Sequence, residues 1–190
     1  MHRFYINFID LSTNIVIIPT YNEKENITAF LNKVLGLAYP FDILVVDDGS
    51  PDGTQDLVRE VMQQNPGRVH LLPRSGKMGL GTAYITGFRW ALAAGYDFIF
   101  EMDCDFSHDP KDLIRLYEAI KSRVSRATIE AGPASIWRYR EFLPIAGDPI
   151  DVGTGFTPLL KANNLARRLG LKSLYIKNDG VNMPTLSFKD

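Results

Sequence analysis

The chain has 190 residues, of which 45% are hydrophobic and 23% are charged, and its net charge is −1. This composition is typical of a globular protein and excludes a disordered chain, and the length suits one domain or one and a half. The balanced charge gives no basis for nucleic-acid binding. The single cysteine, Cys104, excludes an intrachain disulfide and favours a cytoplasmic location.

The apolar segments are too short to cross a membrane. None approaches the ~18 consecutive residues that a spanning helix needs. The opening MHRFYINFIDLS is interrupted by Asn7 and Asp10 and does not have the pattern of a signal peptide. We therefore expect a cytoplasmic protein whose contact with a membrane would be peripheral, at its cytoplasmic face.

Apolar, β-branched runs alternate with helical spacing through the first two-thirds of the chain. Helical spacing begins at Asn22, where Asn22 and Glu25 resemble a capping box. The predicted strands are 14–18, 42–46, 68–73 and 97–102, and the later helices are 54–64, 81–94 and 110–122. Fourfold alternation predicts an α/β fold, with a parallel sheet and helices on both faces.

Polar motifs follow three of these strands, at the sheet edge where such folds bind ligands. Asp103 and Asp105 follow a buried strand, so they indicate a Mg²⁺ or Mn²⁺ site, or else an Asx turn with capping carboxylates. Asp47 and Asp48 begin a loop that could bind ribose hydroxyls or a base edge, or could simply form a turn before the next helix.

Two further segments could contact a nucleotide. In PTYNE, Tyr21 could stack on a base and Glu23 could accept its hydrogen bonds, although an ordinary strand-to-helix turn has the same composition. The loop KMGLGTA lacks the spacing of a Walker A motif. We expect it to let the backbone approach a ligand closely before a helix.

Four segments in this order are similar to family 2 glycosyltransferases of the dolichol- or polyprenyl-phosphate mannosyltransferase type. They are PTYNE at 19–23, VVDDGSPDGT at 45–54, GLGTAYITGF at 79–88 and EMDCDFSHDP at 101–110. The resemblance covers about 14–120. It implies a GT-A-like, Rossmann-like sheet, a GDP-mannose-like donor and a polyprenyl or dolichyl phosphate acceptor.

The resemblance also implies the site residues. The nucleotide-sugar contacts would be Pro19, Tyr21, Glu23, Val45, Asp47, Asp48, Asp103, Cys104 and Asp105. Asp103 and Asp105 would hold the metal and sugar diphosphate, which gives Asp105 the catalytic role; no catalytic base is assigned, and His108 is expected to support its loop. Cys104 stands where the family usually has alanine. The acceptor half of the family, with its GSRY-like segment, does not follow, so the sheet is expected to be incomplete.

The C-terminal part resembles a different family. Residues 136–145, 152–179 and 182–190 are similar to the N-terminal segment of threonine synthase, a pyridoxal-phosphate enzyme, and Lys189 falls on its Schiff-base lysine. We therefore predict a chimera: a glycosyltransferase half at 1–120, a linker at 121–131 and an α/β fragment at 132–190. Two alternatives stay open, a pyridoxal-phosphate-dependent threonine synthase fragment and a nucleotide-sugar-binding module without turnover.

The C-terminal segment is expected not to form a pyridoxal-phosphate site. The cofactor phosphate needs several backbone N–H donors and the ring nitrogen needs a partner, which a lysine alone does not supply. An exposed lysine also stays mostly protonated at neutral pH and is a poor nucleophile. Absorption spectra of the chain mixed with pyridoxal phosphate should show no stoichiometric aldimine band. A band that disappears in Lys189→Ala would contradict this expectation.

Overall fold

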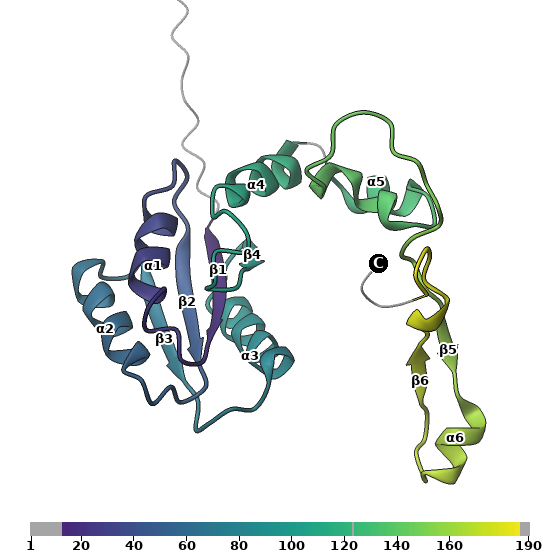
Figure 1. The fold of residues 1–190 in the computed structure, drawn as a ribbon, viewed down its shortest axis with the longest axis horizontal. Coiled ribbons are helices and arrows are strands. Elements are labelled where there is room, and N and C mark those ends of the chain that lie inside the picture. Colours follow the sequence, from purple (N-terminus) through teal and green to yellow (C-terminus); the bar gives the residue numbers. More distant parts are fainter. Residues whose placement is uncertain (1–12, 123, 187–190) are drawn as a thin grey trace, which may run out of the picture. The chain divides into compact units, whose positions relative to one another are not determined.

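In the computed structural model, which describes residues 13–122 and 124–186, the chain divides into two compact units after Tyr117. The first unit is a four-stranded parallel sheet with strand order β3-β2-β1-β4, so β1 lies between β2 and β4 (Figure 1). Its strands are β1 (Asn14–Thr20), β2 (Asp42–Asp47), β3 (Val69–Pro73) and β4 (Phe98–Glu101). Its helices are α1 (Ile27–Leu35), α2 (Thr54–Gln64), α3 (Leu80–Ala93) and α4 (Asp112–Ser122), the last of which continues past Tyr117.

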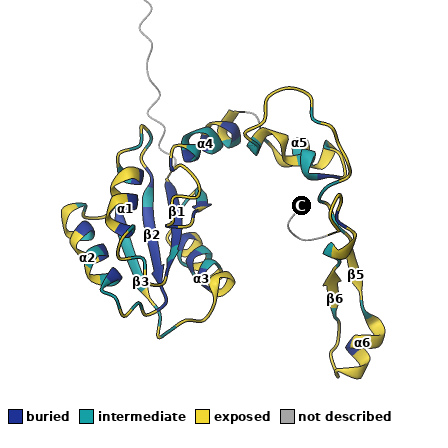
Figure 2. Ribbon diagram, in the orientation of Figure 1, coloured by how far each residue is buried: buried dark blue, intermediate teal, exposed yellow. Residues whose placement is uncertain are grey.

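The central strands are buried because both of their faces are covered (Figure 2). Alternate residues of a strand point to opposite faces. On one face Ile15, Ile17 and Leu44 pack against α3. The opposite face is covered by α1 and α2, and α1 turns the buried residues Phe30 and Leu31 inward (Figure 1). The predicted α/β fold with helices on both faces is therefore confirmed.

The start of α1 differs from the prediction. The helix begins at Ile27, with Asn26 as its N-cap, and not at Asn22. Asn22 has a positive φ of 62°, which is outside the helical region, and its backbone N–H donates to Ser50 Oγ. The predicted capping box at Asn22 is therefore wrong, and residues 21–26 form a turn beside the β2–α2 loop.

The second unit contains short elements and few buried side chains. It holds α5 (Arg126–Ala131), the 3-10 helices η1 (Ile136–Phe142) and η2 (Asp179–Val181), α6 (Asn163–Arg168), and an antiparallel pair of β5 (Leu159–Lys161) and β6 (Tyr175–Lys177). Residues 126–131, inside the segment predicted as linker, form a helix capped by Ser125 Oγ, which accepts from Thr128 N. Lys189 lies outside the described residues. No helix in the described part of the chain has the length and apolar character that crossing a bilayer requires.

Gly87 brings α3 close to β1. A β-carbon added at Gly87 would lie 2.6 Å from Cγ2 of Ile17, a side chain that is fully buried. Real β-carbons do not approach this closely, so a larger residue at this position must shift the buried Ile17 side chain or the helix itself. Gly81, on the same helix, would meet no atom within 4 Å.

Gly87→Ala should therefore destabilise the chain by about 1–3 kcal/mol, because overpacking outweighs the gain in helix propensity. Gly81→Ala is the matched control and should be neutral or stabilising by up to ~1 kcal/mol. Urea unfolding followed by circular dichroism measures both. Equal stabilities for the two variants would show that α3 is not closely packed on β1.

Candidate functional site

A pocket opens at the carboxyl ends of the strands in the first unit. It has a volume of about 300 Å³. Its lining residues are Pro19, Thr20, Tyr21, Glu23, Asp48, Lys77, Gly79, Leu80, Ala83, Asp103, Cys104 and Asp105. After β1 the chain proceeds to β2 and β3 on one side and then returns to β4 on the other. Parallel sheets bind ligands at such a switch point, where the loops after neighbouring strands diverge.

The sequence-predicted residues separate into two groups. Seven of them line this pocket together: Pro19, Tyr21, Glu23, Asp48, Asp103, Cys104 and Asp105. Val45 and Asp47 are fully buried and are not among its lining residues. Sequence reasoning did not single out Thr20, Lys77, Leu80 or Ala83, although the glycine-rich loop that contains Lys77 was expected to approach a ligand.

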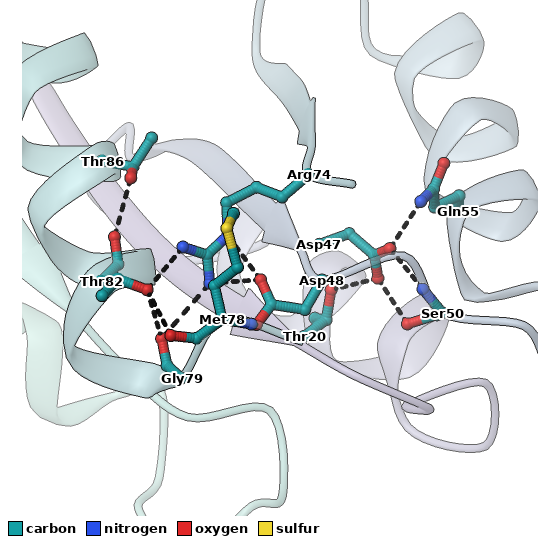
Figure 3. A network of polar contacts seen from close by, with 10 residues as sticks. All are labelled: Thr20, Asp47, Asp48, Ser50, Gln55, Arg74, Met78, Gly79, Thr82 and Thr86. Carbon is teal, nitrogen blue, oxygen red and sulfur yellow. Dashed lines mark hydrogen bonds and ion pairs between the residues drawn. The ribbon is translucent and has the colours of Figure 1, made fainter. Parts of the chain in front are cut away.

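Asp47 holds the β2–α2 loop together. Its carboxylate accepts hydrogen bonds from Thr20 Oγ1 at 2.8 Å, Ser50 N at 2.9 Å and Gln55 Nε2 at 2.6 Å (Figure 3). Burial raises the pKa of Asp47, but these hydrogen bonds outweigh burial and hold the pKa below its ordinary value of 3.8. Because the folded pKa is depressed, Asp47 stabilises the fold above about pH 4, and this contribution is lost as the pH falls through the folded pKa.

Asp48 forms a buried ion pair with Arg74. The Arg74 side chain is 5% exposed and that of Asp48 is 8% exposed. Arg74 also donates to Thr82 Oγ1 at 2.7 Å and to the Gly79 carbonyl at 3.3 Å, while Asp48 accepts from Met78 N at 3.0 Å (Figure 3). The pair therefore ties the end of β2 to the loop that leads into α3.

The two carboxylates after β4 have different surroundings. Asp103 accepts a hydrogen bond from Tyr84 Oη at 2.8 Å, and burial together with this bond raises the pKa of Tyr84, so the phenol stays a donor. Asp105 accepts from Ser107 N at 2.9 Å, and its hydrogen bonds with Ser107 lower its pKa. Asp105 is therefore held as a carboxylate, and Tyr84 orients the Asp103 side chain.

Cys104 lies between these carboxylates and is 2% exposed. Burial raises the pKa of its thiol to about 12, with further contributions from the charges of Glu23, Asp105 and Asp103. The thiol is consequently neutral at physiological pH and a poor nucleophile.

Asp103 and Asp105 fit a hard divalent cation. Among the described residues, no three His, Cys, Asp or Glu side chains converge to form a complete metal site. Mg²⁺ characteristically takes only one or two protein carboxylates and completes its coordination with phosphate oxygens and water. Two carboxylates in an open pocket match that requirement when the ligand brings the phosphate.

The family model described as "Glycosyl transferase family 2" matches residues 15–168. The chain belongs to glycosyl transferase family 2. The match contains the whole pocket and extends past the predicted junction at 121–131.

Two curated relatives carry mannosyltransferase names. The polyprenol monophosphomannose synthase of Mycolicibacterium smegmatis is 43% identical over 133 residues, covering 68% of this chain and 50% of the relative. The undecaprenyl-phosphate mannosyltransferase of Micrococcus luteus is 49% identical over 108 residues, covering 57% of this chain and 44% of the relative. The chain thus spans about half the length of these relatives.

A third relative belongs to another family. The threonine synthase of Methanocaldococcus jannaschii is 43% identical over 81 residues, covering 42% of this chain and 20% of the relative. The 81 residues of this match and the residues 15–168 of the family model add up to more than the 190 residues of the chain, so the two matched regions overlap. Among solved structures, a mannosyltransferase from Pyrobaculum calidifontis in complex with GDP-Man and Mn²⁺ is 30% identical with a TM-score of 0.39, covering 43% of this chain and 27% of its own.

The Asp48–Arg74 pair predicts a large difference between two arginine variants. Arg74→Met should destabilise the chain by about 3–5 kcal/mol, because it leaves a buried carboxylate without its cation. Arg68→Met is the matched control, since Arg68 pairs with Asp42 where the two side chains are 37% and 24% exposed. It should cost roughly 1 kcal/mol. Urea unfolding compares them, and equal losses of stability would contradict the role given to Arg74.

Proposed function

We propose that the pocket is the donor site of a hexosyltransferase, which binds GDP-mannose with Mg²⁺ or Mn²⁺ for transfer of mannose to a polyprenyl or dolichyl phosphate. The observation that carries the proposal is the meeting of Tyr21 and Glu23 with Asp103 and Asp105 in one pocket at the switch point of the sheet. An aromatic ring and a carboxylate suit a nucleobase, and two carboxylates suit a cation that grips a diphosphate. The names of the mannosyltransferase relatives support the choice of mannose and of a polyprenyl phosphate.

Each side chain has a distinct role in this proposal. Tyr21 stacks on the base and Glu23 accepts a hydrogen bond from it, with Pro19 beside them. Asp103, oriented by Tyr84, and Asp105 would hold the cation; when bound, the cation neutralises the charge that develops on the departing diphosphate. The neutral thiol of Cys104 adds no charge between the two carboxylates.

The buried residues Val45 and Asp47 would act from behind the pocket. Asp47 binds Thr20, and Thr20 lines the pocket, so Asp47 is connected to the site through one hydrogen bond. Its own carboxylate is fully buried and accepts hydrogen bonds from Ser50 and Gln55. The prediction that Asp47 and Val45 contact the nucleotide stays a prediction.

The acceptor phosphate is already an anion, so the transfer needs no strong base. A phosphate oxygen can attack the anomeric carbon directly while the nucleoside diphosphate leaves.

The acceptor is a lipid, and we propose that the protein meets it peripherally at the cytoplasmic face of a membrane. The chain spans about half the length of its mannosyltransferase relatives, so binding of the nucleotide and transfer of mannose must be tested separately. Nucleotide binding without transfer of mannose to a polyprenyl phosphate would favour a binding module without turnover.

The threonine synthase likeness supports a mixed origin of the chain, which we propose as a glycosyltransferase part followed by a threonine-synthase-like part. It supplies no observation in favour of pyridoxal phosphate, and the lysine concerned, Lys189, lies outside the described residues. We therefore give the pocket of the first unit the functional role.

Asp105→Asn tests the donor site. The substitution keeps the shape of the side chain but removes the charge that would hold the cation, so GDP affinity should fall about tenfold or more and lose its dependence on Mn²⁺. Isothermal titration calorimetry with GDP, with and without Mn²⁺, measures this change. Asp109→Asn is the matched control, because Asp109 pairs with Lys33 at 3.3 Å and does not line the pocket. Metal-independent GDP binding that is equal in the wild type and Asp105→Asn would count against the proposal.

A further inference from the structure

The pocket holds one cationic side chain whose function the metal site does not explain. Lys77 is the only residue with a positive charge among the described residues that line the pocket. Its Nζ lies 4.7 Å from the ring centroid of Tyr21. Within the described part of the chain Lys77 forms no ion pair, so the Tyr21 ring is the group that holds its ammonium.

The backbone on both sides of Lys77 is fixed. On one side Met78 N donates to Asp48 Oδ2 at 3.0 Å. On the other side Gly76 packs against Gly49, where an added β-carbon would lie 3.4 Å from the Gly76 backbone. Gly49 has a φ of 72°, a conformation that a glycine adopts without strain. The loop thus presents Lys77 at the pocket, where its long side chain is exposed to solvent.

The charges around the pocket call for such a cation. Glu23, Asp103 and Asp105 line it as acids, whereas Asp48 is neutralised by Arg74. A nucleoside diphosphate carries two or more negative charges into this acidic environment. A single divalent cation between two carboxylates neutralises part of the negative charge of the diphosphate. The ammonium of a lysine can neutralise a further part.

We propose that Lys77 is a phosphate-binding residue of the donor pocket, whose ammonium rests on the Tyr21 ring until a nucleotide arrives and then pairs with the diphosphate. This inference rests on the proposed function. A base that stacks on the same face of Tyr21 displaces the ammonium. A charge-assisted hydrogen bond to a phosphate oxygen is stronger than a cation–π contact at an exposed site, so the ammonium moves to the phosphate. Lys77 then stabilises the departing diphosphate as the sugar is transferred.

The test compares ligands that differ only in their phosphates. Lys77→Met keeps the aliphatic stem and removes the charge. By calorimetry with the full chain and Mn²⁺, its affinity for GDP should fall about tenfold, while its affinity for guanosine should be unchanged or higher because no ammonium competes with the base for the Tyr21 ring. Lys77→Arg should recover part of the GDP affinity, and Lys111→Met, an exposed lysine outside the pocket, should bind both ligands as the wild type does.

The outcomes separate this inference from the proposed function. A wild-type chain that fails to bind GDP would contradict the donor site itself. A wild-type chain that binds GDP, together with Lys77→Met that binds GDP equally well, would overturn the role of Lys77 alone. An equal loss of affinity for GDP and for guanosine in Lys77→Met would also overturn it, because a loss that does not depend on the phosphates indicates a disturbed loop.

Discussion

The buried ion pair between Asp48 and Arg74 determines the form of the pocket. Both side chains are almost completely removed from water, and an unpaired charge at that depth costs several kcal/mol, so the fold requires both partners to be in place. Arg74 follows β3 and Asp48 follows β2, which means that their pairing draws the β3–α3 loop across the end of the sheet. The hydrogen bonds of the pair to Met78, Gly79 and Thr82 then fix where α3 begins.

The pocket has two walls, and the Asp48–Arg74 pair anchors only one of them. One wall comes from the loops after β1 and β4, which carry Tyr21, Glu23 and the two aspartates. The other comes from the loop that the ion pair anchors, which carries Lys77. The close packing of Gly87 on Ile17 holds α3 against the same strand from which the first wall extends. Packing of the sheet and geometry of the site are thus linked through one helix.

Local patterns in the sequence were sufficient to predict the sheet and the edge at which the pocket lies. Short β-branched runs separated by helical spacing leave few other folds, and the polar motifs follow the strands directly. The partner of Asp48 could not be predicted in this way, because Arg74 is 26 positions away and only the folded loop brings the two residues together. The hydrogen bond between Tyr84 and Asp103 could not be predicted either, because these residues are also far apart in the sequence. The turn before α1 also involves a distant loop, because the backbone N–H of Asn22 donates to Ser50 Oγ.

The two units differ in how they are stabilised. In the first, fully buried aliphatic and aromatic residues form a core on both faces of the sheet. In the described part of the second unit, the only buried apolar residues are Ala119 and Ala166, and most of the residues are exposed to solvent (Figure 2). Its local structure relies on polar contacts, such as those of Arg138 with the carbonyls of Ile129 and Pro133. The buried core and the acidic pocket both lie in the first unit, so that unit carries the proposed function.

Paramagnetic broadening by Mn²⁺ in amide NMR spectra of the full chain tests the central claim most directly, because it reports where the cation binds. In the presence of GDP, trace Mn²⁺ should broaden the amides of residues 103–105 and of the pocket wall around Lys77, and should do so much less without GDP. Broadening centred on the acidic residues Glu25 and Asp52 and absent from residues 103–105, or centred on the second unit, would contradict the assignment of the pocket as a metal-assisted nucleotide site.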